Sequence, residues 1–169
     1  GVTTVSGLDG SSWSCAYPDL QDAINSATGG DEIWVADGVY KPASSTDSIA
    51  FSGAKDGLKI YGGFQSGDTF SQRNPEGNVT ILSGDVGGTA DDYPDGDNII
   101  EDHVDINGEN ATHVLYLDGV TNGITGSTVI DGFTITAGQA DATSESGGGL
   151  YCDAGTVGTP SECSPTLRN

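Results

Sequence analysis

The sequence has no methionine and very few basic residues. It holds 5 Lys and Arg against 25 Asp and Glu, a formal net charge of −20. Such an acidic surface repels nucleic acids and anionic membranes, which argues against both as partners. No apolar run approaches the roughly 18–20 residues that cross a membrane, so we expect no membrane insertion. Because the chain lacks an initiator methionine and opens without a basic or apolar leader, we expect that a signal peptide has already been removed.

Cysteine is scarce as well. Cys152 and Cys163 flank a segment rich in Gly, Thr and Pro. In an exported protein this spacing predicts a disulfide that closes the segment. Cys15 is left over, either buried and free or bonded to something outside this chain. His103 and His113 stand far from any cysteine pair, so no spacing resembles a zinc site.

One helix is expected, at about residues 18–28. Its apolar stripe at helical spacing consists of Leu20, Ala23, Ile24 and Ala27. A short helix with a single apolar face is stable mainly when that face lies on something flat. We therefore expect this helix to cover the first, otherwise open edge of a sheet.

After the helix, short strands alternate with turns rich in Gly, Asp and Asn. Strands are expected at Glu32–Ala36, Leu58–Tyr61, Val79–Leu82, His113–Leu117, Thr128–Ile130, Phe133–Thr136, Gly149–Cys152 and Thr166–Leu167. A β-sandwich shows short strands at similar intervals. Near the C-terminus, however, the apolar anchors Phe133, Leu150 and Leu167 recur at steps of about 17 residues, which favours a solenoid.

Several motifs, taken in order, carry a resemblance to a known family. They are WSCAYPDLQDAINSATGGDEIWVADGVYKP (13–42), YGGF (61–64), QRN (72–74), TILSGD (80–85), VIDGFTIT (129–136), GGGLY (147–151) and SPTLRN (164–169). This set resembles secreted bacterial and archaeal right-handed β-helix proteins, including relatives of the chlamydial polymorphic outer-membrane proteins. Cys15 and a long acidic insertion after Asp85 depart from the family's pattern.

The resemblance implies a fold and an extracellular address. The expected fold class is all-β, a right-handed parallel β-helix (solenoid) with a short N-terminal capping α-helix. Residues 1–169 form one such domain, or a fragment of a longer solenoid. The family includes adhesin-like surface proteins. The motif of the first coil is also similar to that of pectate-lyase-type enzymes, so analogy of fold leaves catalysis open.

The acidic insertion, at about residues 85–110, is the densest feature of the sequence. It contains nine acidic residues and no Lys or Arg. Ca²⁺ takes six to eight oxygen ligands in flexible geometry, which this composition can supply. The candidate ligands for a structural calcium ion are Asp85, Asp91, Asp92, Asp95, Asp97, Asp102, Asp105 and Glu109. A solvated acidic loop without metal is the alternative.

Catalysis finds little support in the residue types. A polysaccharide lyase needs a Lys or Arg base beside groups that neutralise a uronate. Lys59 alternates with apolar neighbours and is expected to face solvent, and Arg73 is expected to pair with an acid and hold its turn. A glycoside hydrolase needs two carboxylates across a cleft. Asp131 fits that role, although Asp-Gly is also a turn between strands. No catalytic residue is assigned.

Other residues have two interpretations. The aromatic residues Trp13, Trp34, Tyr61 and Phe64 are suited to stacking on sugars, but packing near the helical cap is the simpler expectation. Asn78 and Asn110 each begin an N-glycosylation sequon, which matters only in a host that glycosylates exported proteins. His113 is expected to be a structural hydrogen-bonding residue.

These observations lead to one functional hypothesis and two alternatives. The hypothesis is a non-catalytic, secreted structural or adhesive protein of the cell surface, stabilised by calcium. It associates with itself through open ends, as a subunit stacking into a filament, or binds surface glycans. The alternatives are a polysaccharide lyase or glycoside hydrolase, and a non-catalytic carbohydrate-binding module.

Overall fold

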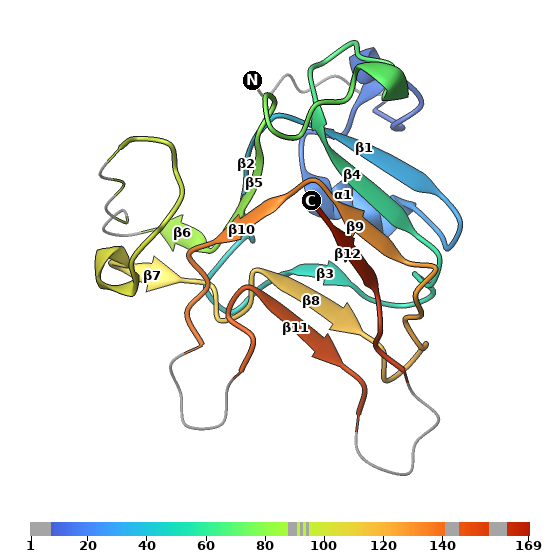
Figure 1. Cartoon of the computed structure of the whole chain (residues 1–169). Coiled ribbons are helices and arrows are strands. Elements are labelled where there is room, and N and C mark those ends of the chain that lie inside the picture. The colour runs from blue at the N-terminus through green and yellow to red at the C-terminus, as the bar shows by residue number, and fades with distance from the viewer. Residues whose placement is uncertain (1–7, 88–90, 92, 94, 141–145, 156–161) are drawn as a thin grey trace.

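A computed structural model of the chain describes residues 8–87, 91, 93, 95–140, 146–155 and 162–169. Most of its strands belong to three parallel sheets that surround a common core (Figure 1). Sheet A contains β1 (Glu32–Ala36), β4 (Lys59–Phe64), β9 (Val129–Asp131) and β12 (Thr166–Arg168). Sheet B contains β2 (Gly38–Tyr40), β5 (Thr80–Ser83) and β10 (Thr134–Thr136). Sheet C contains β3 (Ile49–Phe51), β8 (Leu115–Asp118) and β11 (Leu150–Asp153).

The chain visits these sheets in a fixed order, from A to B to C and back to A. The acidic insertion interrupts this order between β5 and β8, and projects from one side of the molecule (Figure 1). It contributes β6 (Asp85–Gly87) and β7 (Glu109–Asn110), which pair antiparallel, and the 3₁₀-helix η3 (His103–Asp105). Two further 3₁₀-helices are η1 (Trp13–Cys15) and η2 (Phe70–Gln72).

The predicted fold class, an all-β right-handed parallel β-helix, is wrong in this form. The described residues combine twelve short strands, in four small sheets, with one α-helix and three 3₁₀-helices. The small sheets are mostly parallel, and the class is mixed rather than plain all-β. Alternating apolar residues identified many of the strands, but they carry no information on the helical turns or the antiparallel pair between them.

The core consists of apolar ladders that run across the parallel sheets. In sheet A, the strand register places Ile33, Ile60, Ile130 and Leu167 in one row. Ile60 and Ile130 are 0% and 3% exposed, whereas Leu167 on the last strand is 55% exposed. Each inner side chain of such a row is covered by the side chains at the register positions on both neighbouring strands. The resulting burial of apolar surface is the main stabilising contribution of the sheet.

The α-helix α1 (Leu20–Ser26) closes the side of the core nearest the first strands. It is shorter than the predicted 18–28 segment, because Asp19 caps its first turn by accepting a hydrogen bond from the Gln21 amide N–H at 2.7 Å. Leu20 and Ile24 are buried in the core. At the other end, the buried Lys55 ammonium donates to the backbone carbonyls of Asn25 and Ala27, which satisfies acceptors at the helix C-terminus.

The predicted disulfide is present. Cys152 on β11 is bonded to Cys163, with a Cα–Cα distance of 5.6 Å. A covalent closure of this length stabilises a folded chain by roughly 2–3 kcal/mol. Both cysteines pack against the hydrophobic core, while Cys15 is a free, half-buried thiol.

Candidate functional site

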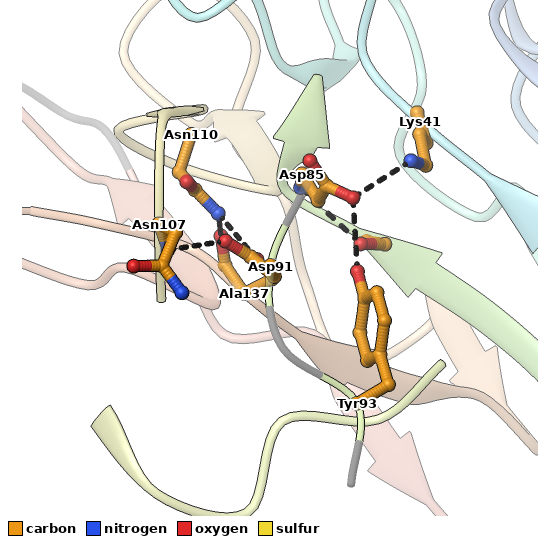
Figure 2. A network of polar contacts seen from close by, with 8 residues as sticks. Lys41, Asp85, Asp91, Tyr93, Asn107, Asn110 and Ala137 are labelled. Carbon is orange, nitrogen blue, oxygen red and sulfur yellow. Dashed lines mark hydrogen bonds and ion pairs between the residues drawn. The ribbon is translucent and has the colours of Figure 1, made fainter. Parts of the chain in front are cut away.

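Asp85, at the start of the acidic insertion, is a buried carboxylate with two polar partners (Figure 2). Its Oδ2 atom lies 3.1 Å from the Lys41 ammonium and accepts a hydrogen bond from the Tyr93 hydroxyl at 3.0 Å. Desolvation and the hydrogen bond to Asp85 raise the pKa of Tyr93 from 10.0 to about 12. Asp85 therefore joins the insertion to the segment that follows β2.

Asp91 is a second buried carboxylate, and its partners are neutral (Figure 2). It accepts hydrogen bonds from the Asn107 backbone N–H at 2.6 Å and from the Asn110 side-chain amide at 2.8 Å. None of the ion pairs found among the described residues includes Asp91. A buried negative charge without a cation is costly unless hydrogen bonds or a bound ion compensate for it.

Asn110 connects this carboxylate to sheet B. Its amide group donates to Asp91 and to the Ala137 backbone carbonyl at 2.9 Å, and the residue is only 7% exposed. Its Oδ1 atom is buried without a hydrogen-bond partner among the described residues. A buried oxygen without a partner is an unsatisfied hydrogen-bond acceptor, and a water molecule or a cation can satisfy it.

The remaining predicted calcium ligands are dispersed. Four of them are exposed: Asp95, Asp97, Asp102 and Glu109. Asp105 is half-buried, and Asp92 lies outside the described residues. Two of them form local turns, since Asp97 accepts from the Ile99 N–H and Asp102 from the Val104 N–H. Across the described part of the chain, no three His, Cys, Asp or Glu side chains gather closely enough to hold a metal ion. Calcium binding stays a prediction.

Arg73 and Asp131 form a buried ion pair on the outer side of sheet A. The Arg73 Nη2 and Asp131 Oδ1 atoms are 2.5 Å apart, and the side chains are 11% and 8% exposed. Arg73 also donates to the Gly62 carbonyl, and Asn169 donates to Asp131 at 2.9 Å. The pair thus holds the turn after η2 against β4 and β9. A cavity of about 430 Å³ lies beside it, lined among others by Glu76 and Phe133.

Two of the three remaining cations, Lys55 and Lys59, are also held by the protein. Lys59 pairs with Glu32 on the neighbouring strand at 3.3 Å, and Lys55 caps α1. Arg168 lies exposed on β12. The positively charged side chains that sequence analysis considered for proton abstraction, Lys59 and Arg73, thus have carboxylate partners that reduce their availability for chemistry.

An aromatic cluster lies on the outward face of β1 and β4. Trp34 stacks on Phe64, with ring centroids 5.1 Å apart and an interplanar angle of 4°. Phe70 of η2 contacts Trp34 at 5.6 Å and Tyr61 at 5.2 Å. Trp13 contacts Phe64 at 5.8 Å and donates its indole N–H to the Asp68 carbonyl at 2.9 Å. Trp34 and Phe70 remain 37% and 45% exposed.

Trp13, Trp34, Tyr61 and Phe64 were predicted from the sequence to pack together or to stack on sugars, whereas Phe70 was not. Phe70 lies in a turn of polar residues with no periodic pattern, so nothing local marks it as a partner of Trp34. A capping box of Thr69 and Gln72 forms this turn and places the Phe70 ring on sheet A. The sequence signal that could have indicated this turn is the capping pattern T-x-x-Q at Thr69–Gln72.

Both sequon asparagines use their amide groups inside the protein. The Asn78 amide donates to the Gly63 carbonyl at 3.4 Å, and the Asn110 amide is buried as described above. A glycan on either nitrogen requires that these hydrogen bonds be given up. His113 is placed structurally, with its Nδ1 atom 3.1 Å from the Gly147 carbonyl and its ring stacked on Tyr151.

Comparisons with protein-family models, curated proteins and solved structures find no match for this chain. The resemblance to secreted β-helix proteins accordingly stays a sequence-based prediction. No helix among the described residues is long and apolar enough to cross a membrane.

Proposed function

We propose that this protein is a non-catalytic extracellular structural or adhesive protein that associates with other copies through the free edges of β10, β11 and β12. The observation that supports it best is the difference between the two ends of the parallel sheets. One end is covered by a helix, whereas in the described residues the other presents strand edges and the half-exposed ladder side chain of Leu167.

The covered end is built around α1. The helix contacts β1 and β3, the first strands of sheets A and C. The Gln21 side chain acts in place of a neighbouring strand: its Nε2 atom donates to the Ala50 carbonyl at 3.0 Å, and its Oε1 atom accepts from the Ala50 N–H at 2.6 Å. Pairing of these edge groups prevents another strand from binding there.

The other end lacks such a cover among the described residues. β10, β11 and β12 each pair with a strand on one side only. Leu167 is 55% exposed although its neighbour in the same ladder, Ile130, is 3% exposed. An open edge with exposed apolar side chains is a template for strand addition, which combines backbone hydrogen bonds with burial of apolar surface.

Two other features support the extracellular and non-catalytic parts of the proposal. The disulfide between Cys152 and Cys163 is typical of an oxidising compartment outside the cytosol. Lys41, Lys59 and Arg73 all pair with carboxylates, as expected of side chains that hold the fold together.

The proposal is tested by the molar mass of the purified chain over a wide concentration range, measured by sedimentation or light scattering. We expect the mass to rise with concentration, and a Leu167→Lys variant to stay monomeric at concentrations at which the wild type associates. The matched control is Val104→Lys, since Val104 is 66% exposed but lies in η3 of the insertion. A monomeric wild type, or equal loss in both variants, rejects strand addition at this edge.

A further inference from the structure

We infer that the exposed aromatic surface on sheet A binds chains of neutral sugars by ring stacking. This surface, called here the aromatic platform, consists of Trp34, Tyr61 and Phe70. The inference is independent of strand addition, because the platform lies on the outward face of β1 and β4 and not on the free edges of the last strands.

The alternation of β1 and β4 explains why these rings point outward. Ile33 and Val35 belong to the core, so Trp34 between them faces away from it. Tyr61 is the register partner of Trp34 and follows the core residue Ile60 on β4. The rings are therefore placed on the surface by the same register that buries their neighbours.

The platform is pre-organised by contacts on its inner side. Phe64 is fully buried and supports the Trp34 indole in a nearly parallel stack. Tyr61 contacts Phe70 in a T-shaped arrangement, with ring centroids 5.2 Å apart, and the Arg73 guanidinium lies 5.5 Å from the Tyr61 centroid. Arg73 is itself fixed by its pair with Asp131. Rings held in this way lose little conformational freedom when a ligand binds.

Despite this packing, the platform stays partly accessible. Trp34 is 37% and Phe70 is 45% exposed, and they touch each other. Adjacent exposed aromatic side chains commonly mark a binding site, because contact of large apolar rings with water is unfavourable and a bound ligand removes them from it.

The surroundings of the platform favour a neutral sugar as the ligand. The apolar C–H face of a pyranose ring suits the electron-rich face of an aromatic ring. Its hydroxyl groups need polar neighbours, which the rim supplies: Glu32 shares the outward face of β1 with Trp34, and Ser71 and Gln72 follow Phe70 and are exposed.

Charge argues against acidic ligands at the same place. The cations near the platform, Lys59 and Arg73, are paired with Glu32 and Asp131. The chain as a whole carries a net charge of −20. Uronic acid polymers, sulfated glycans and nucleic acids are therefore repelled, whereas an uncharged hexose or pentose polymer is not.

The test is affinity electrophoresis of the whole chain in gels that contain soluble β-glucan, mannan, xylan or starch, with polygalacturonate and alginate as acidic comparisons. We expect at least one neutral polymer to retard the wild type, and neither acidic one. Phe70→Ala weakens this binding by about tenfold, the loss expected for one stacking ring. Trp34→Phe keeps an aromatic ring on Phe64 while reducing the stacking area, and weakens binding less.

The control is Val104→Ala, which removes a more exposed apolar side chain far from the platform in sequence and is expected to bind like the wild type. Thermal unfolding of each variant shows whether it is folded. Absence of retardation by every neutral polymer overturns the inference, as does a folded Phe70→Ala protein that binds with wild-type affinity. If the platform instead mediates self-association, no polymer retards the wild type, and Phe70→Ala lowers the molar mass at high concentration. That result also overturns the inference.

Discussion

Two buried carboxylates of the acidic insertion differ in how their charge is compensated. Asp85 has a cation and a hydroxyl as partners, Lys41 and Tyr93. Asp91 has only neutral donors, from Asn107 and Asn110. Their sequence context gives no hint of this difference, because small residues flank Asp85 and Asp91 and neither neighbourhood contains a basic residue. Burial and the choice of partner depend on residues from other parts of the chain, such as Lys41 after β2 and Asn110 on β7.

The Tyr93 hydroxyl makes alkaline stability a test of the Asp85 site. In the folded chain its pKa is about 12, against 10.0 for an unperturbed tyrosine, so the folded state retains a proton that the unfolded state releases between about pH 10 and 12. The free energy of unfolding therefore falls as the pH rises through this interval. We expect Tyr93→Phe to reduce that fall, and to cost about 1 kcal/mol at pH 7 through the lost hydrogen bond.

Urea unfolding at a series of pH values measures both effects. Tyr40 and Tyr116 also have raised pKa values, mainly through desolvation, so part of the alkaline decline persists in the variant. An unchanged slope between pH 10 and 12 contradicts the assignment of this proton to Tyr93.

At the scale of elements, α1 depends on the strands that it covers and is not stable by itself. Its seven residues are too few to be stable alone, and Leu20 and Ile24 anchor it in the core. Gln21 then provides the two hydrogen bonds that β3 lacks on its free side. The apolar stripe predicted the helix, whereas the function of Gln21 depends on a strand almost thirty residues away.

Gln21→Ala is expected to lower the free energy of unfolding by about 1–2 kcal/mol, because both hydrogen bonds to Ala50 are lost and an edge is opened. Denaturant unfolding measures the change. Ser26→Ala, at the exposed end of the same helix, is the control and is expected to have little effect. Equal stability of the wild type and Gln21→Ala contradicts the edge-covering role.

Strand prediction succeeded where apolar residues alternate and failed elsewhere. The predicted segments around β1, β4, β5, β8, β9, β10, β11 and β12 all contain strands; β1 has the predicted bounds, and the ends of the others differ by up to three residues. The three-residue strands β2 and β3, and the pair β6 and β7, were missed. GVY and IAF are too short to show a period, and become strands only because β5 and β8 lie beside them.

At the scale of the whole molecule, charge is the dominant feature. With 25 acidic and 5 basic residues, the folded state repels itself, and cations in the medium reduce this cost. Asp91 is the place where a specific cation has most to contribute, since its buried carboxylate accepts from Asn110, whose Oδ1 atom has no hydrogen-bond partner in the part of the chain that the structure describes.

We expect millimolar CaCl₂ to raise the melting temperature above its value in EDTA, and more than NaCl of equal ionic strength, because a bound ion stabilises only the folded state. Asp91→Asn removes the buried charge but also one of the two acceptor oxygens, so we expect its melting temperature in EDTA to stay close to that of the wild type, and most of the calcium increment to be lost. Scanning calorimetry or circular dichroism measures the shift. Equal effects of the two salts mean that general screening alone acts on this surface.

Local features of the sequence were sufficient for the disulfide, for the helix and for most of the strands, because spacing and periodicity are properties of neighbouring residues. The tertiary structure alone decided the mixed fold class, the partners of Asp85 and Asp91, and the recruitment of Phe70 to the aromatic platform. Arg73 and Asp131, for example, are 58 positions apart and meet only because their strands and turns stack. Contacts of this kind depend on the register between distant segments, which no local pattern specifies.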